Sequence, residues 1–187
     1  MVRYNSLLLS VGGNIGDTAE QFGRLCRLLE ERVGSVTAIS PYYKTAPWGF
    51  ASDHAFTNAA AEVLTTLAPL EILDATQEIE RLLGRTRKSE KGVYHDRTID
   101  IDLIAYNDMV ISTERLTLPH PLMAQRRFVL QPLCDIAPDW VHPLLHRSVR
   151  QLLEECADKT EALLIRNPMI EKKTTNLSVD SQSQIET

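Results

Sequence analysis

Cysteine is scarce in this sequence, and the few cysteines lie far apart. The 187 residues include three of them, namely Cys26, Cys134 and Cys156. An odd number of widely spaced cysteines forms neither a disulfide framework nor a Cys-x-x-Cys pair. This usage favours a reducing compartment, and we expect a cytoplasmic protein. The five histidines show no metal-ligand spacing together with cysteine, which argues against a zinc site.

Long apolar runs and an excess of positive charge are also missing. The apolar run Leu7-Leu8-Leu9 near the N-terminus is too short for a signal peptide or a membrane span. The formal net charge is −5 and the isoelectric point is about 5.5, which argues against a broad nucleic-acid surface. We therefore expect neither a nucleic-acid partner nor a membrane partner. The hydrophobic content of 43% suits one compact domain.

The common glycine-rich and nucleophile motifs are absent as well. The segment 12–16 has the spacing Gly-Gly-x-x-Gly, which is not the dinucleotide fingerprint, and no Gly-Lys-Ser/Thr of a P-loop occurs. No Gly-x-Ser-x-Gly elbow is present, and no cysteine has an evident activating partner. Taken alone, segment 12–16 is best interpreted as a turn between a strand and a helix.

The pattern of apolar and turn residues predicts alternating strands and helices. Strands are expected over residues 6–11, 36–43, 56–64 and 98–106, with residues 109–111 pairing with the last of these. Helices are expected from the N-cap Asp17 to Gly34, from Pro69 to Gly84, from Met123 to Leu133 and from Val149 to Cys156. This order resembles a ferredoxin-like α+β sandwich, with helices on one face of an antiparallel sheet. We expect one domain over residues 1–165 and a polar, disordered tail over 166–187.

The segment Arg97-Thr98-Ile99-Asp100-Ile101-Asp102 carries the most chemical information. Alternate residues of a strand share a face, so Asp100 and Asp102 lie together opposite the apolar Ile99 and Ile101. A divalent cation would relieve the repulsion between the two carboxylates, and Mg²⁺ commonly takes one or two carboxylates plus substrate phosphates. The basic residues just before this strand suit an anion. Two plainer interpretations remain open: a solvated outer face, or surface ion pairs between these acids and arginines.

Three other groups of residues have a plain and a functional interpretation. Gln77 and Glu80 lie off the apolar stripe of their predicted helix, and a solvated polar face is favoured for them. His120 lies between two prolines, where a structural or solvated role is the more common one. Trp48 and the nearby Phe50 could anchor a loop or stack on a flat ligand.

Several segments, taken in chain order, together form a specific set. They are Ser10–Asp17, Tyr43–Pro47, Phe56–Ala60, Gln77–Glu80, Gly84–Arg87, Arg97–Asp102, Arg115–Pro121 and Arg126–Phe128. This set resembles the 6-hydroxymethyl-7,8-dihydropterin pyrophosphokinase family of folate biosynthesis. The resemblance implies an ATP-dependent diphosphotransferase with a ferredoxin-like fold and two Mg²⁺ ions. Such an enzyme transfers pyrophosphate from ATP to a reduced hydroxymethylpterin and releases AMP.

The resemblance also implies roles for particular residues. The catalytic residues it implies are Arg85, Arg97, Asp100 and Asp102, of which the two aspartates would bridge the metal ions. The nucleotide-binding residues it implies are Gln77, Glu80, Arg87, Leu103, Arg115, Thr117, His120 and Arg126. The pterin-binding residues it implies are Thr45, Ala46, Trp48, Phe56, Asn58 and Phe128. The expected partners are ATP and the reduced pterin, and a monomer is expected.

The sequence departs from the family pattern at several places. The family commonly has an aromatic–Gly–Pro stretch before the key arginine, whereas this chain has Lys91-Gly92-Val93-Tyr94-His95-Asp96. Ala46 stands where proline is frequent, Phe56 where tyrosine is frequent, and Trp48 where an aliphatic residue is frequent. Two other functions are compatible with the residues alone. One is a different two-metal phosphoryl or nucleotidyl transferase, and the other is a non-catalytic nucleotide-binding protein with a ferredoxin-like fold.

Overall fold

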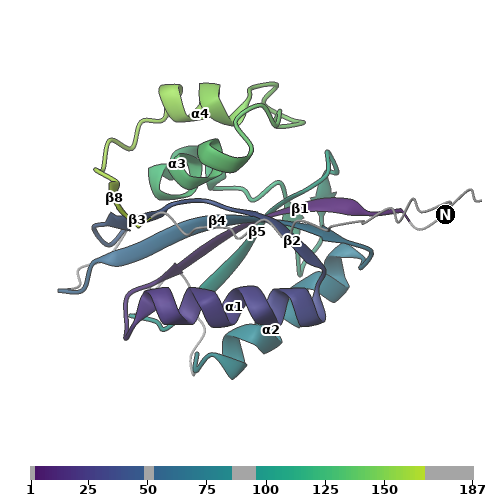
Figure 1. The fold of residues 1–187 in the computed structure, drawn as a ribbon. Coiled ribbons are helices and arrows are strands. Elements are labelled where there is room, and N and C mark those ends of the chain that lie inside the picture. The colour runs from purple at the N-terminus through teal and green to yellow at the C-terminus, as the bar shows by residue number, and fades with distance from the viewer. Residues whose placement is uncertain (1–2, 49–52, 86–95, 167–187) are drawn as a thin grey trace, which may run out of the picture.

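Two helical layers lie on opposite faces of an antiparallel sheet in the computed structural model (Figure 1). The structure describes residues 3–48, 53–85 and 96–166. Helices α1 (Thr18–Arg32) and α2 (Pro69–Leu82) cover one face, and α3 (Arg127–Ile136) covers the other, with α4 (Val149–Glu155) packed on α3. The predicted antiparallel α+β sandwich is therefore confirmed, but the helices occupy both faces of the sheet instead of one.

Strand β1 lies between β5 and β4 in the sheet and sets the register around the site. The strand order is β5-β1-β4-β3-β8, and β2 also pairs with β4. The bounds are β1 Asn5–Gly13, β2 Ser35–Ile39, β3 Tyr42–Thr45, β4 Phe56–Thr65, β5 Asp100–Tyr106 and β8 Leu163–Arg166. Gly12 of β1 lies opposite Asn58 of β4 on one side and opposite Asp100 of β5 on the other. The register thus brings two distant segments of the chain to either side of one glycine.

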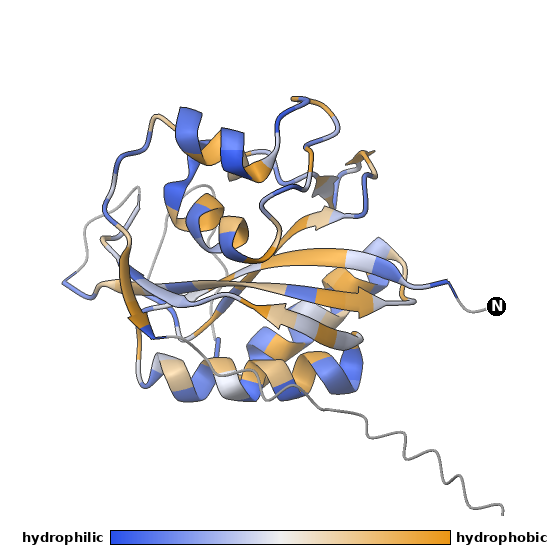
Figure 2. Ribbon diagram, turned by 45° about the horizontal axis from the view of Figure 1, so that its top comes forward, coloured by the Kyte–Doolittle hydropathy of each residue, from blue (hydrophilic) through white to orange (hydrophobic). Residues whose placement is uncertain are grey.

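Strand alternation divides the apolar side chains between two cores. Leu7 and Leu9 of β1 pack with α1 and α2, whereas Leu8 packs in the second core with residues of α3 and α4. On β5, Ile101 and Leu103 belong to the first core and Ile104 to the second. The helices are correspondingly amphipathic, with their orange apolar residues turned toward the sheet (Figure 2). Asp100 and Asp102 share the parity of Ile104, so they lie on the α3 face of the sheet.

The predicted helix boundaries follow from identifiable caps. Asp17 accepts the backbone amide of Glu20 at 3.0 Å, which confirms it as the N-cap of α1. Pro69 begins α2, as its fixed φ favours. Helical periodicity predicts an apolar stripe of Ile72, Ala75, Thr76, Ile79, Leu82 and Leu83 on α2. Ile72 and Ile79 are buried as predicted, but Leu82 is 45% exposed and does not belong to the stripe.

The predicted strand over 36–43 is in fact two strands. Pro41 has no amide to donate to a ladder, and β2 ends before it while β3 begins after it. Ser40 keeps this break attached to β4. Its amide donates to the Ala60 oxygen at 2.9 Å, and its hydroxyl accepts the Ala60 amide at 2.8 Å. The chain can therefore change direction here without leaving buried polar groups unpaired.

Two further predictions of local structure are wrong. The segment at 109–111 does not pair with β5, since β6 (Ile111–Ser112) forms a separate two-stranded sheet with β7 (Thr117–Leu118). The helix predicted over 123–133 begins as a single 3₁₀ turn at Met123–Gln125, and α3 starts only after Arg126. The extended backbone of Arg126, with φ −116° and ψ 103°, interrupts the helical hydrogen bonds.

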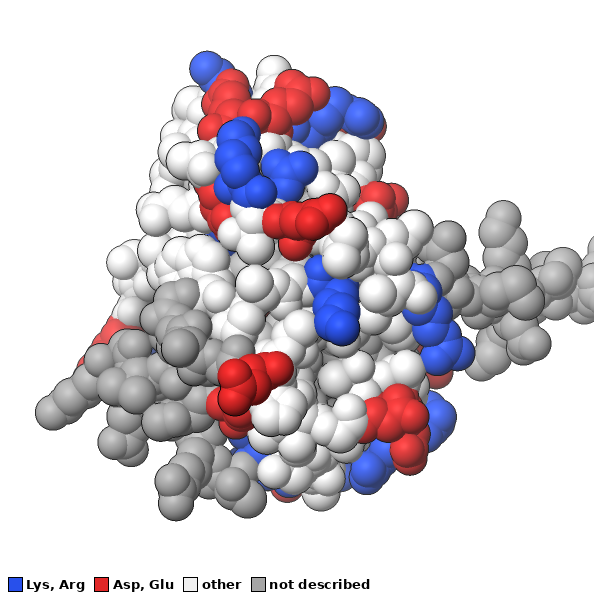
Figure 3. Space-filling view, turned by 90° about the vertical axis from the view of Figure 1, so that its left-hand side faces the viewer, with Lys and Arg blue, Asp and Glu red and all other residues white. Residues whose placement is uncertain are grey.

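The outer surface and the chain ends bear on the remaining predictions. On the face that Figure 3 shows, blue and red side chains of the described residues are interspersed and form no continuous basic area. Within 3–48, 53–85 and 96–166, no helix has the length and apolar character needed to span a bilayer. Arg166, predicted as the first residue of the tail, is the last residue of β8. The rest of that tail, 167–187, lies outside the described residues.

Candidate active site

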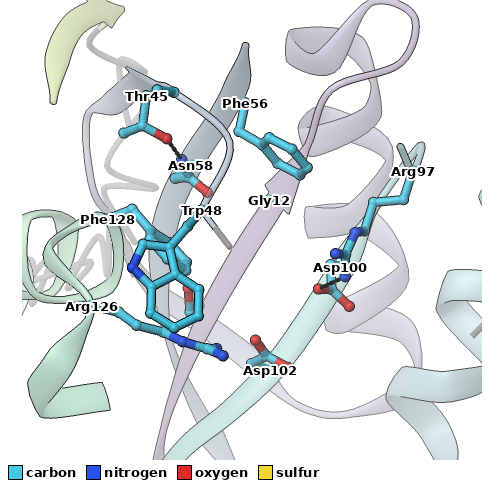
Figure 4. A pocket seen from close by; sticks show the side chains of 12 residues that line it. Gly12, Thr45, Trp48, Phe56, Asn58, Arg97, Asp100, Asp102, Arg126 and Phe128 are labelled. Carbon is cyan, nitrogen blue, oxygen red and sulfur yellow. Dashed lines mark hydrogen bonds and ion pairs between the residues drawn. The ribbon is translucent and has the colours of Figure 1, made fainter. Parts of the chain in front are cut away.

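A pocket opens on the α3 face of the sheet, where β1 ends and β4 and β5 begin. Figure 4 shows polar and aromatic side chains converging on it from separate parts of the chain. Its walls are formed by Ser10, Gly12, Thr45, Ala46, Trp48, Phe56, Asn58, Arg97, Asp100, Asp102, Arg126 and Phe128. The structure therefore brings together all six predicted pterin residues and three of the four predicted catalytic residues.

Gly12 makes room at the centre of this pocket. A Cβ atom at Gly12 would lie 2.9 Å from Oδ1 of Asn58, closer than real Cβ contacts allow. The turn predicted for Gly12 is wrong, since Gly12 and Gly13 are the last two residues of β1. Two glycines at the end of a buried strand are a signal of close backbone approach that could have identified this position.

Asn58 and Thr45 form the polar end of the pocket. The Asn58 Nδ2 group donates to Oγ1 of Thr45 at 2.8 Å, and both residues are buried. This bond fixes which way the amide faces, so the Asn58 carbonyl oxygen points toward the space beside Gly12 (Figure 4). An amide oxygen in that place can accept a hydrogen bond from an N–H group of a ligand.

Aromatic side chains hold Arg126 beside the pocket. Its guanidinium carbon lies 4.7 Å from the centre of the Trp48 ring and 5.7 Å from that of Phe128. The Trp48 and Phe128 rings are 6.3 Å apart and tilted by 57°. Such cation–π contacts restrict the motion of a guanidinium group more than hydration by water does. In Figure 4 the Arg126 side chain extends toward Asp102, at the acidic end of the pocket.

Asp100 is the centre of a compact charge cluster. Its Oδ1 accepts a hydrogen bond from Nη1 of Arg85 at 2.5 Å, and its Oδ2 accepts one from Arg97. The Arg85 and Arg97 side chains are 11% and 10% exposed, so these are not the surface ion pairs that the sequence left open. Arg85 also donates to Oε1 of Glu80 at 2.5 Å. The charges of two carboxylates and two guanidinium groups thus neutralise each other at a site with little access to water.

Glu80 is buried, so the interpretation of a solvated polar face is wrong for this residue. It is 5% exposed. Its Oε1 accepts the backbone amide of Ile101 at 2.8 Å and thereby ties the end of α2 to the start of β5. Burial raises the pKa of Glu80 to about 7, and the charge of Asp100 adds to the rise while Arg85 opposes it. The helical pattern did not predict this burial, because β5 and Arg85 cover the last turn of α2.

Glu80→Gln should change the pH dependence of stability. A carboxyl whose pKa is raised from 4.5 to about 7 binds its proton more tightly in the folded state. The stability it contributes is therefore lost as pH rises between those values. We expect the difference in unfolding free energy, wild type minus Glu80→Gln, to fall from pH 4.5 to pH 7 and to level off above. Urea unfolding across that range measures it, and a difference that rises with pH would contradict the assigned burial.

Asp102 carries an unfavourable charge in the substrate-free protein. Burial raises its pKa to about 6, the charge of Asp100 raises it further, and Arg126, Arg97 and Arg85 oppose the rise. A cation near both carboxylates would relieve this cost. The described residues contain no group of three or more His, Cys, Asp or Glu side chains placed to hold a metal ion. Two carboxylates nevertheless suit Mg²⁺ when phosphate oxygens complete its shell.

His120 lies close to this cluster as a neutral group. Its Nδ1 accepts the backbone amide of Leu122 at 3.2 Å, and its own amide donates to the Ile104 oxygen at 2.9 Å. Burial lowers the pKa of His120 to about 4, and the positive charge of Arg126 lowers it further. With Nδ1 accepting, the proton of the neutral ring is assigned to Nε2, which can donate to an anion.

Four other predicted nucleotide residues, all in the described part of the chain, do not line the pocket. Arg115 pairs with Asp74 at an exposed site, and Thr117 is exposed in β7. Leu103 is buried in the core beneath the sheet, and Gln77 is half-buried on α2. Arg87 lies outside the described residues. The roles of these residues remain predictions.

The sequence of this chain is similar to known pterin enzymes. Residues 8–138 match the model of the 7,8-dihydro-6-hydroxymethylpterin-pyrophosphokinase family. The 2-amino-4-hydroxy-6-hydroxymethyldihydropteridine pyrophosphokinase of Porphyromonas gingivalis is 48% identical over 136 residues, covering 72% of this chain and 92% of that protein. The enzyme of the same name from Bacillus subtilis is 41% identical over 133 residues, covering 71% and 78%.

Longer proteins contain a similar region. The folic acid synthesis protein fol1 of Schizosaccharomyces pombe is 37% identical over 148 residues, which cover 79% of this chain and 20% of that protein. The Plasmodium falciparum HPPK-DHPS structure with SDX-DHP shares the fold, with a TM-score of 0.69 at 17% identity. The region that aligns covers 82% of this chain and 44% of the solved chain. The family match and the identities show that the chain belongs to the 7,8-dihydro-6-hydroxymethylpterin-pyrophosphokinase family.

Proposed function

We propose that this protein transfers pyrophosphate from ATP to 6-hydroxymethyl-7,8-dihydropterin, giving the pterin diphosphate and AMP in folate biosynthesis. The names of its relatives support this reaction. The observation that carries the proposal is the register at Gly12, which has Asn58 on one side and Asp100 on the other. A polar and aromatic end for a flat heterocycle thereby adjoins an acidic and basic end for phosphates.

The aromatic end of the pocket suits a pterin. Phe56 and Phe128 both line the pocket and offer flat apolar faces for offset stacking. The Asn58 oxygen, fixed by Thr45, accepts an N–H of the pterin amide edge. Trp48 and Ala46 close the same end. A heterocycle held in this way directs its hydroxymethyl group toward Asp100 and Asp102.

The charged end suits a metal-bound triphosphate. Asp100 and Asp102 would hold two Mg²⁺ ions, which when bound stabilise the negative charge on the phosphate oxygens. Occupation of Asp100 by a cation would release Arg85 and Arg97 from their pairs with this carboxylate. Their forked guanidinium groups then face phosphate oxygens, together with Arg126 and the Nε2 proton of His120. The other nucleotide contacts proposed are those of Gln77, Glu80, Arg87, Leu103, Arg115 and Thr117.

The pocket residues act by positioning and by charge. In the proposed step, the pterin hydroxyl oxygen bonds to the β-phosphorus and loses its proton to solvent, while the bond from that phosphorus to the α,β-bridging oxygen breaks and AMP leaves. Little covalent work remains for the protein in such a transfer. The fixed arginines stabilise the charge that develops on the phosphate oxygens. The Trp48 and Phe128 rings around Arg126 keep this guanidinium in place before substrates arrive.

We also propose that one copy of the chain is sufficient and acts in the cytoplasm. The low, unpaired cysteine content supports a reducing compartment. Sedimentation at micromolar concentration, with and without ATP, should give the mass of one chain.

A single assay tests the proposed reaction against its alternatives. Protein, Mg²⁺, ATP and the reduced hydroxymethylpterin are mixed, and the products are separated. We expect AMP and pterin diphosphate in a one-to-one ratio. Formation of ADP or free pyrophosphate would instead indicate a different two-metal transferase. Tight ATP binding without any turnover would indicate a non-catalytic nucleotide-binding protein.

A further inference from the structure

Asn14 joins three segments that are far apart in the sequence. It directly follows β1 and is 7% exposed. Its Nδ2 group donates to the backbone oxygen of His54 at 3.3 Å and to Oδ1 of Asp96 at 2.6 Å. Its Oδ1 accepts the backbone amide of Arg97 at 2.8 Å, and its own amide donates to the Arg97 oxygen at 3.0 Å. One buried side chain thus attaches the segments before β4 and β5 to the end of β1.

Asp96 supplies the charge in this arrangement. While its Oδ1 accepts from Asn14, its Oδ2 lies 3.5 Å from Nδ1 of His54. Hydrogen bonds to a carboxylate are shorter and stronger than bonds between neutral groups. Asp96 is the last residue of the segment in which this chain departs from the family pattern. The departure therefore has a physical consequence in this chain.

The part that these contacts fix is the backbone of Arg97. A Cβ atom at Gly13 would lie 2.4 Å from the Thr98 oxygen, so β1 packs directly against this stretch of backbone. The Arg97 side chain leaves it to pair with Asp100, and its guanidinium carbon lies 5.8 Å from the centre of the Phe56 ring. A small shift of this backbone would move a guanidinium that touches both ends of the pocket.

We propose that Asp96 is a positioning residue that acts through Asn14 to set the backbone of Arg97 for pyrophosphate transfer. The inference rests on the proposed function and deepens it, since Asp96 itself lines no part of the pocket. Loss of the carboxylate leaves the Asn14 amide with one fewer acceptor, and Arg97 then samples more positions. Turnover falls, whereas pterin affinity, which depends on Asn58 and the aromatic rings, changes little.

Kinetics of matched variants test the proposal. Asp96→Ala should lower kcat roughly three- to ten-fold, as expected for loss of one partly exposed charge-assisted bond. Its KM for the pterin should change much less than its kcat. Asp53→Ala is the control, since this carboxylate is exposed on the segment that carries His54. A kcat of Asp96→Ala within two-fold of wild type would overturn the proposal.

A reciprocal exchange separates positioning from general loss of stability. Asn14→Asp removes the donor and sets two carboxylates against each other, so its kcat should fall further than that of Asp96→Ala. In the double variant Asn14→Asp/Asp96→Asn, residue 96 donates and residue 14 accepts, so part of the lost kcat should return, while the bond to the His54 oxygen stays lost in both variants. Asp96→Asn is measured alone as well, and a double variant as slow as the product of the effects of Asn14→Asp and Asp96→Asn would overturn the proposal.

A substrate-free measurement distinguishes failure of this inference from failure of the proposed reaction. Hydrogen exchange at the Arg97 amide, followed by NMR, should be faster in Asp96→Ala than in wild type. Exchange at the Ile101 amide, which Glu80 holds, should not change. If the wild type makes no pterin diphosphate, the reaction is wrong, but the exchange result still decides whether Asp96 sets the Arg97 backbone. Equal exchange at Arg97 in both proteins would overturn the inference.

Discussion

Asp102→Asn should lower kcat about 10³-fold, which corresponds to about 4 kcal/mol of transition-state stabilisation. The amide keeps the size of the side chain but loses the charge that would hold a cation beside the triphosphate. The fold should not suffer. Burial and the charge of Asp100 raise the pKa of Asp102 to about 6, so its ionised form is unfavourable in the folded protein. Removing that charge should leave the melting temperature unchanged or higher at pH 8.

The control for this variant is Asp108→Asn. Asp108 follows the same strand in an exposed turn, away from the pocket. Steady-state kinetics with saturating ATP and Mg²⁺, together with thermal melting, compare the two variants with wild type. Near wild-type turnover of Asp102→Asn would contradict the metal assignment. Asp100→Asn is a less clean test, because Asp100 pairs with both Arg85 and Arg97 and its neutralisation would leave this partly buried cluster with one excess positive charge.

Arg97→Lys should lower kcat about 10²-fold although the positive charge is kept. The planar guanidinium presents two parallel donors to phosphate oxygens, whereas an ammonium offers a point charge on a flexible chain. In this structure Arg97 also pairs with Asp100 and lies over Phe56. A lysine reproduces neither the fork nor the flat contact with the ring, so both the position and the direction of the donors are lost.

The comparison for this variant is Arg81→Lys. Arg81 pairs with Glu78 on the exposed side of α2, where the side chain is 69% exposed. Its replacement should change kcat less than two-fold, since surface pairs contribute little. Pre-steady-state measurement of AMP formation separates the chemical step from product release. Equal rates for Arg97→Lys and wild type in that step would show that Arg97 does not act on the transferred phosphates.

Local patterns in the sequence predicted much of the fold. Asp17 and Pro69 mark helix starts because their effects depend only on the next turn of the chain. The alternation around Asp100 and Asp102 placed both acids on one face, since strand geometry alone decides it. The break at Pro41 was also readable in principle, because proline cannot donate to a ladder.

Features that depend on distant pairing were not predictable in this way. The place of Gly12 in the pocket follows from its register with Asn58 and Asp100, which lie 46 and 88 positions away in the numbering. The burial of Glu80 depends on the start of β5 passing over the end of α2. The role of Asn14 could be inferred only from the structure, which places Asp96 beside it. The residues expected in the pocket were identified from the family resemblance, because hydrophobic periodicity does not show which distant segments lie together.

The most direct test of the paired carboxylates counts the metal ions that they hold. Electron paramagnetic resonance of Mn²⁺, titrated into the protein with a non-hydrolysable ATP analogue, gives the number bound per chain. We expect two ions for wild type, and at least one fewer for Asp102→Asn at the same free Mn²⁺ concentration. Equal counts in both proteins would contradict the assignment of Asp100 and Asp102 as the metal site.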